Sequence, residues 1–133
     1  MPRADRVPIL PGRSLITVPA TLNDSDDLAL IADTGAERTV ISRAVAIRLG
    51  LDLLRPLRLQ PLVGVGRSPP VPVVRLDRVR VGASTVSGVE ASVFDLPRFF
   101  RADGLLGLNF LRRFRVTFAF DAGILILREP PTR

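Results

Sequence analysis

One short segment combines residue types that could do chemistry with a position where a carboxylate has no simple packing role. Asp33-Thr34-Gly35-Ala36 follows Leu28–Ala32, a nearly continuous apolar run that predicts a strand buried on both faces. Because burying an unpaired carboxylate is costly, an acid at the end of such a strand indicates a functional site. Asp, Thr and Gly are also good turn formers, so these residues alone are equally typical of an ordinary turn.

The composition restricts which chemistry such an acid could join. The sequence contains no His and no Cys, which excludes disulfides, thiolate metal sites, cysteine nucleophiles, Ser-His-Asp triads and the usual zinc hydrolases. All 19 basic side chains are arginines, which excludes the lysine of a Walker A loop and Schiff-base chemistry. Any hydrolysis would therefore use carboxylates, hydroxyls, arginines or a hard metal ion.

The net charge of +6 raises the alternative of a nucleic-acid partner. The arginines are scattered from Arg3 to Arg133, and Trp and Tyr, which could stack on bases, are absent. An all-arginine composition is equally what a compositionally biased genome would produce. We therefore do not expect nucleic-acid binding; a nucleic-acid binder would show strongly salt-dependent affinity for DNA or RNA.

The length of 133 residues predicts a single domain over residues 1–133, with a core from about 15 to 127 and loose proline-rich termini. The segment Met1–Arg13 has no apolar stretch typical of a signal peptide. The longest apolar runs are too short to span a bilayer. We expect a cytoplasmic protein without a membrane segment, unless the chain was cut from a longer anchored parent.

Short β-prone runs separated by turn residues predict a mostly-β domain with two short helices. Strands are expected over Leu15–Leu22, Leu28–Ala32, Thr39–Ile41, Leu57–Val63, Val71–Leu76, Val79–Val81, Val89–Phe94, Val116–Phe120 and Ile124–Leu127. Polar turns are expected at Asn23–Asp27, Gly82–Gly88 and Asp121–Gly123, and a Gly- and Pro-rich hairpin tip at Gly64–Pro70.

Both expected helices follow apolar turns that contain glycine. One runs from the N-cap Ser42 through Leu49 and ends at Gly50, and the other runs from a capping Asn109 to about Phe114. A hairpin, an apolar-plus-Gly turn and a helix occur in each half, with Ile31–Gly35 and Asp103–Gly107 as the two turns. This weak internal repeat indicates a pseudo-two-fold architecture.

With their order and separation, these motifs resemble those of the retropepsin-like aspartic proteases, in the single-domain bacterial branch of the retroviral protease superfamily. The resemblance spans about Leu15 to Leu127. Its motifs are Leu30-Ile31-Ala32-Asp33-Thr34-Gly35-Ala36, Thr39-Val40-Ile41-Ser42 and Asp103-Gly104-Leu105-Leu106-Gly107-Leu108-Asn109-Phe110-Leu111. It implies a small closed β-barrel with two short helices, in which the hairpin tipped by Gly64–Pro70 is a flap.

The resemblance also implies an endopeptidase of peptides or proteins that needs no cofactor or metal. Aspartic proteases are the standard example of two carboxylates that share one proton around a water, so that one pKa is driven up and the pair titrates as a unit. One chain supplies one Asp-Thr-Gly, so Asp33 would face a second Asp33 across the two-fold axis of a homodimer. The first strand and the last hairpin are candidates for the interface.

Other roles carry over by position. Asp33, Thr34 and Gly35 would form the catalytic loop, with Thr34 hydrogen-bonding across the dimer and Gly35 leaving room and a carbonyl for the substrate. The substrate-binding residues implied by the resemblance are Ala36, Glu37, Gly64, Val65, Gly66, Leu105 and Leu106.

Two departures from the family pattern concern the interface and the flap. Retroviral relatives pair the acid at the Glu37 position with an arginine just after the support turn, where this chain has Leu108, so Glu37 would need Arg38 or Arg112 as its partner. Prolines after the flap tip, including Pro72, would stiffen that arm. A catalytically silent peptide-binding or scaffolding module of the same fold is the alternative function.

Further patterns give weaker matches. Gly64-Val65-Gly66 lacks the third glycine of a dinucleotide-binding loop, and no base is in reach of Ser42 or Ser92 by sequence. The acids of Asn23–Asp27 could bind a hard cation, but the segment lacks the Gly and Glu of a calcium loop.

Overall fold

The computed structural model describes residues 4–63 and 68–131, and most of its regular structure is β. The strands are β1 (Ala4–Pro8), β2 (Thr17–Leu22), β3 (Ser25–Ala32), β4 (Thr39–Ile41), β5 (Arg58–Gln60), β6 (Val71–Val81), β7 (Ser84–Val93), β8 (Gly104–Leu106), β9 (Arg115–Ala119) and β10 (Ile124–Arg128). The helices are α1 (Arg43–Arg48), α2 (Leu108–Leu111) and the 3₁₀ turn η1 (Arg98–Phe100).

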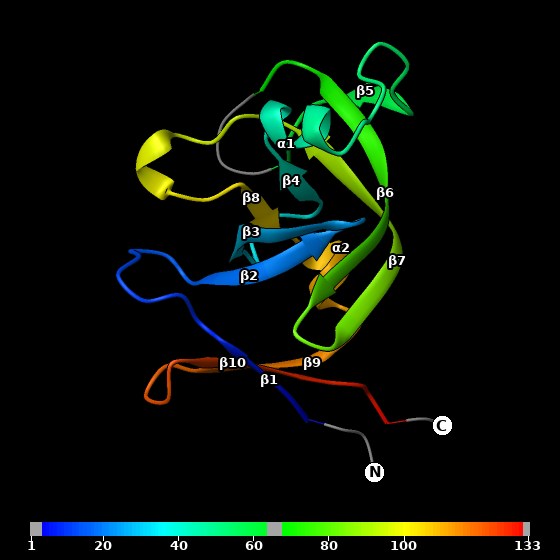
Figure 1. The fold of residues 1–133 in the computed structure, drawn as a ribbon. Coiled ribbons are helices and arrows are strands. Elements are labelled where there is room, and N and C mark those ends of the chain that lie inside the picture. The colour runs from blue at the N-terminus through cyan, green and yellow to red at the C-terminus, as the bar shows by residue number, and fades with distance from the viewer. Residues whose placement is uncertain (1–3, 64–67, 132–133) are drawn as a thin grey trace.

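Six of the strands close into a barrel. They follow the order β2-β3-β8-β4-β7-β6, and β6 pairs back onto β2 through Thr21↔Arg80 and Leu22↔Val79. β5 pairs with the first three residues of β6, Val71–Val73. A separate three-stranded sheet, in the order β1-β10-β9, lies beyond the barrel at the end where both termini emerge (Figure 1). The predicted fold, a mostly-β closed barrel with two short helices, is confirmed.

Branched aliphatic side chains fill the space inside the barrel and beneath it. The largest fully buried residues are Phe110, Leu22, Leu30, Ile41, Leu76, Leu106, Leu125, Leu127, Val7, Val18, Val73 and Val79. Phe110 of α2 also lies 5.1 Å from Phe114, measured between ring centroids. Because α2 and the three-stranded sheet contribute to the same cluster as the barrel, the two sheets share one hydrophobic core.

The N-terminus departs from the prediction of loose ends. β1 pairs antiparallel with β10 from Ala4↔Arg128 to Pro8↔Ile124, and Val7 is only 1% exposed. The Asp5 carboxylate accepts hydrogen bonds from the Ala83 amide at 2.9 Å and the Ser84 hydroxyl at 2.6 Å. The prediction was wrong here because β1 is proline-flanked, and its pairing partner lies at the far end of the chain.

Two predicted turns are shorter in the structure. The turn between β2 and β3 is only Asn23-Asp24, and that between β6 and β7 only Gly82-Ala83, so the residues expected to extend these turns belong to strands. β6 runs unbroken through the two strands predicted over Val71–Val81. Polar and glycine residues mislead at these positions because the outward face of a barrel strand tolerates them.

The first helix agrees with its prediction and the second does not. The Ser42 hydroxyl accepts a hydrogen bond from the Val45 amide at 3.1 Å, and Gly50 ends α1 with φ +74°. α2 starts from Gly107 instead, and Asn109 lies inside it. No helix in the described part of the chain has the length and apolar character needed to cross a membrane.

Candidate active site

The loop that carries Asp33 is fixed to the barrel at both of its ends. β3 runs parallel to β8, with Ala32 opposite Leu106, and the Asp33 amide donates to the Leu106 carbonyl at 3.0 Å. The Ala36 amide donates to the Asp33 carbonyl at 3.2 Å and closes a tight turn. The Leu108 amide donates to the Ala36 carbonyl at 2.8 Å. The start of α2 therefore supports the far side of the loop.

The Asp33 carboxylate is held by its own turn. Its Oδ1 accepts a hydrogen bond from the Gly35 amide at 2.8 Å, and the residue is partly exposed. A Cβ on Gly35 would lie 3.2 Å from the same oxygen. Glycine at position 35 therefore keeps the space beside the carboxylate open while its amide orients the acid.

Asp33 lines a cleft of about 440 Å³. Four other predicted site residues line the same cleft, namely Gly35, Ala36, Glu37 and Leu105. The remaining lining residues are Arg38, Val40, Leu62, Val63, Ser68, Ser92, Phe94 and Leu96. The cleft therefore brings the acid together with a mostly apolar wall.

The expectation that Leu106 binds substrate is wrong. Leu105 lines the cleft, whereas Leu106 is 0% exposed and belongs to the core. Successive residues of a strand point to opposite faces, so two neighbours on β8 cannot both face the cleft. Thr34 is exposed at the turn and does not line the cleft.

Gly64, Val65 and Gly66, the predicted substrate-binding residues of the flap, lie outside the described residues. The arms beside them are described. Gln60 of β5 pairs with Val71 of β6, and the Leu62 amide donates to the Ser68 hydroxyl at 2.8 Å. Leu62, Val63 and Ser68 all line the cleft, so the base of this hairpin forms part of its wall.

Several lining residues were not predicted to face substrate. Arg38 was considered only as a partner of Glu37, but its Nη1 donates to the Ser92 hydroxyl at 3.2 Å. β4 and β7 are parallel neighbours, with Ile41 opposite Val93, and this pairing brings Ser92 and Phe94 to the cleft. Sequence patterns do not reveal such a pairing, because α1, β5 and β6 all lie between its two strands in the sequence.

Glu37 does not form the ion pair that we expected. In residues 4–63 and 68–131 the ion pairs are Arg58–Glu90, Arg78–Asp24 and Arg80–Asp26. Glu37 is exposed at the end of the Asp33 loop and lines the cleft. Asp24 and Asp26, which we considered for a cation, are thus paired with arginines.

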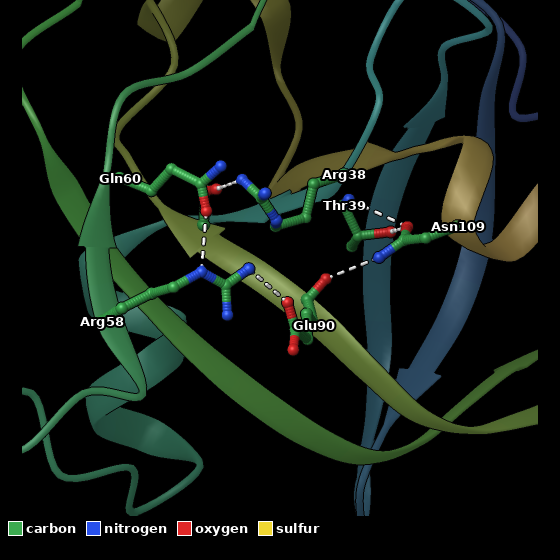
Figure 2. Close-up of polar contacts among 7 residues, drawn as sticks. Arg38, Thr39, Arg58, Gln60, Glu90 and Asn109 are labelled. Carbon is green, nitrogen blue, oxygen red and sulfur yellow. Dashed lines mark hydrogen bonds and ion pairs between the residues drawn. The ribbon is translucent and has the colours of Figure 1, made fainter.

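A partly buried polar cluster anchors the strand that follows the loop (Figure 2). The Thr39 amide and hydroxyl both donate to Asn109 Oδ1, at 3.0 and 2.9 Å. Asn109 Nδ2 donates to the Glu90 carbonyl at 2.7 Å, and the Gly107 amide donates to the Thr39 hydroxyl at 3.2 Å. The Asn109 side chain therefore joins β4, α2 and β7 behind the Asp33 loop.

We expect Asn109→Ala to lower the free energy of unfolding by about 2 kcal/mol, because it leaves the buried Thr39 amide and the Glu90 carbonyl without partners. Urea denaturation would measure this loss. Asn109→Asp is the matched variant: it keeps an acceptor for Thr39 but cannot donate to Glu90, so it should fall between wild type and Asn109→Ala. An Asn109→Ala protein as stable as wild type would show that the cluster does not hold β4.

Comparison with solved structures shows that this closed barrel has a retropepsin-like fold. The chain is similar to a crystal structure of a retropepsin-like aspartic protease from Rickettsia conorii, with a TM-score of 0.68 and 22% identity, covering 97% of this chain and 92% of that one. It is also similar to the retroviral protease-like domain of Ddi1 from Leishmania major, with a TM-score of 0.55 and 20% identity, covering 86% and 93%.

These two similarities show the fold. A separate comparison with family models shows the family. The family model described as aspartyl protease matches residues 18–110, which is more than half of the chain and includes the Asp33 loop. The chain belongs to this aspartyl protease family. A comparison with curated proteins found no match.

Proposed function

We propose that this protein is an aspartic endopeptidase in which the Asp33 carboxylates of two identical chains activate a water molecule. One observation carries the proposal: Asp33 lies in an apolar-walled cleft with one carboxylate oxygen held by the Gly35 amide. Membership of the aspartyl protease family supports the same chemistry.

The proposed reaction needs one ionised and one protonated carboxyl group. The ionised Asp33 takes a proton from water as the water oxygen attacks the peptide carbonyl carbon, and the other Asp33 gives its proton to the carbonyl oxygen. In the second step the Asp33 that took the proton from water gives it to the amide nitrogen, while the other, now ionised, Asp33 takes a proton from a hydroxyl of the tetrahedral intermediate. The C–N bond breaks, the carbonyl re-forms, and the pair again holds one proton. A single chain offers one such loop, so the second acid must come from a partner copy.

The acid in the second half of the internal repeat does not supply this partner. Asp103 Oδ2 accepts a hydrogen bond from the Ala29 amide at 2.8 Å, and the Asp103 carbonyl accepts one from the Ser42 amide at 3.0 Å. These bonds hold β8 between its neighbours. Asp103 therefore has a structural role, which favours a homodimer over a site completed within one chain.

Cleavage of a peptide library by the wild-type protein, read by mass spectrometry from acid to neutral pH, tests this function. We expect cleavage with apolar residues beside the scissile bond, because Val40, Phe94, Leu96 and Leu105 line the cleft. No cleavage by folded, dimeric wild type at any pH would reject the endopeptidase and favour a silent peptide-binding module.

Subunit mixing tests the requirement for two chains. Adding about a tenfold excess of Asp33→Ala protein should lower wild-type cleavage roughly tenfold after subunits exchange, since most wild-type chains then pair with an inactive partner. The same excess of an unrelated protein is the control. Unchanged activity, in a mixture where heterodimers are shown to form, would mean that one Asp33 is enough.

A further inference from the structure

A second cleft, of about 480 Å³, lies beside the candidate active site. We call it the arginine cleft; its lining residues include Arg38, Arg58, Glu90, Arg112 and Arg113. Glu37 and Arg38 line both clefts, so the two are neighbours that meet at the end of the catalytic loop. An extended chain bound over Asp33 can continue past Arg38 into the arginine cleft.

The arginine cleft holds more arginines than carboxylates. Arg58 donates to Glu90 at 2.6 Å and to Gln60 at 2.7 Å, as Figure 2 shows. The hydrogen bond from Arg58 is the main cause that holds the pKa of Glu90 below its ordinary value, and the charges of Arg38 and Arg75 add to it. Glu90 is thus paired with Arg58 and also feels the positive charges of Arg38 and Arg75.

Two further arginines contribute positive charge at the other wall. Arg112 and Arg113 follow α2, are exposed, and take part in none of the ion pairs formed within the described residues. Arg38 donates to a neutral hydroxyl, that of Ser92. With Glu37 as the only other acid in this lining, a surplus of guanidinium donors faces the cleft.

The chemistry of this lining fits an anionic group, and a carboxylate is the anion that an unmodified peptide side chain offers. A guanidinium group presents a planar fork of donors that matches the two oxygens of a carboxylate. Nucleic acid would present phosphates and bases, but the described lining includes no aromatic side chain on which a base could stack. Its continuity with the Asp33 cleft also favours a peptide side chain.

We propose that the arginine cleft is a specificity site that binds an acidic side chain of the substrate, beyond the residues that flank the scissile bond. This inference rests on the proposed endopeptidase function. It assigns to Arg112 and Arg113 a role in substrate choice that the reaction itself does not require.

The first test uses pairs of substrate peptides that differ only in having Glu or Gln at one position beyond the residues that flank the scissile bond. Each such position is tested in turn. We expect kcat/KM to be about fivefold higher for Glu at one position, a preference that weakens with added salt. The Arg112→Gln/Arg113→Gln double variant should lose this preference and cleave the Gln peptide as wild type does. Arg115→Gln removes an exposed arginine outside the cleft and should keep the preference.

A binding test separates this inference from the proposed function. Asp33→Ala protein captures peptides from a library whose members occur as matched Glu and Gln versions, and mass spectrometry reads the enrichment. Enrichment of Glu peptides that the double variant abolishes supports the specificity site, even if wild type cleaves nothing and the endopeptidase proposal fails.

The opposite results are equally informative. Cleavage by wild type with equal kcat/KM for Glu and Gln at every position would overturn the specificity site and leave the endopeptidase intact. Displacement of captured peptides by a single-stranded oligonucleotide, without any Glu enrichment, would instead assign the arginines to nucleic acid.

Discussion

Asp33→Ala should lower peptide cleavage by at least about 10³-fold, because the variant cannot take a proton from the attacking water. The affected quantity is kcat for a peptide identified by library cleavage, measured for both proteins at the same concentration. Cleavage by Asp33→Ala at a rate close to that of wild type would exclude Asp33 as the catalytic acid.

Asp52→Ala is the matched control for this substitution. Asp52 Oδ1 accepts a hydrogen bond from the Leu54 amide at 3.0 Å, the same local arrangement as Asp33 with Gly35. Asp52 does not line the Asp33 cleft. Both variants lose one exposed hydrogen bond within a turn, so thermal denaturation should show similar small losses of stability. Only Asp33→Ala should lose peptide cleavage.

Gly104→Ala should destabilise the fold by about 3 kcal/mol. A Cβ on Gly104 would overlap the Val40 carbonyl oxygen and lie 2.9 Å from the carbonyl carbon. Both atoms belong to the backbone of β4, which pairs with β8 at this point, so β4 or β8 must shift. Urea denaturation would measure the loss as a lower midpoint.

Gly123→Ala provides the comparison for a glycine with free space around it. Gly123 has φ +65°, and nothing lies within 4 Å of the position of its Cβ. Its replacement should cost only about 1 kcal/mol from backbone strain. Equal losses for the two variants would show that close packing of β8 against β4 does not set the requirement for glycine at position 104.

Local signals predicted the elements on either side of the Asp33 loop. The apolar run before Asp33 forms β3, and Ser42 and Gly50 bound α1 as expected. These features depend on burial, capping and backbone conformation within a few residues. The sequence around them therefore contains the information that a prediction requires.

The walls of the clefts depend on pairings between distant segments. Leu105 and Leu106 have the same residue type, and only the placement of β8 between β3 and β4 determines which of them faces the cleft. Arg58 meets Glu90 because β5 and β7 both pair with β6. No local sequence pattern predicts such contacts, since only the pairing of the strands determines which arginine lies next to which carboxylate.

The pairing of β1 with β10 also decides how the domain responds to tension on its ends. Ala4 lies opposite Arg128, so a pull on the two termini acts at the open end of an antiparallel pair. The force then breaks the hydrogen bonds between β1 and β10 one pair after another, as in unzipping, rather than loading all of them together, as in shear. β1 would peel away at low force, before the load reaches β2 and the barrel closure between β2 and β6.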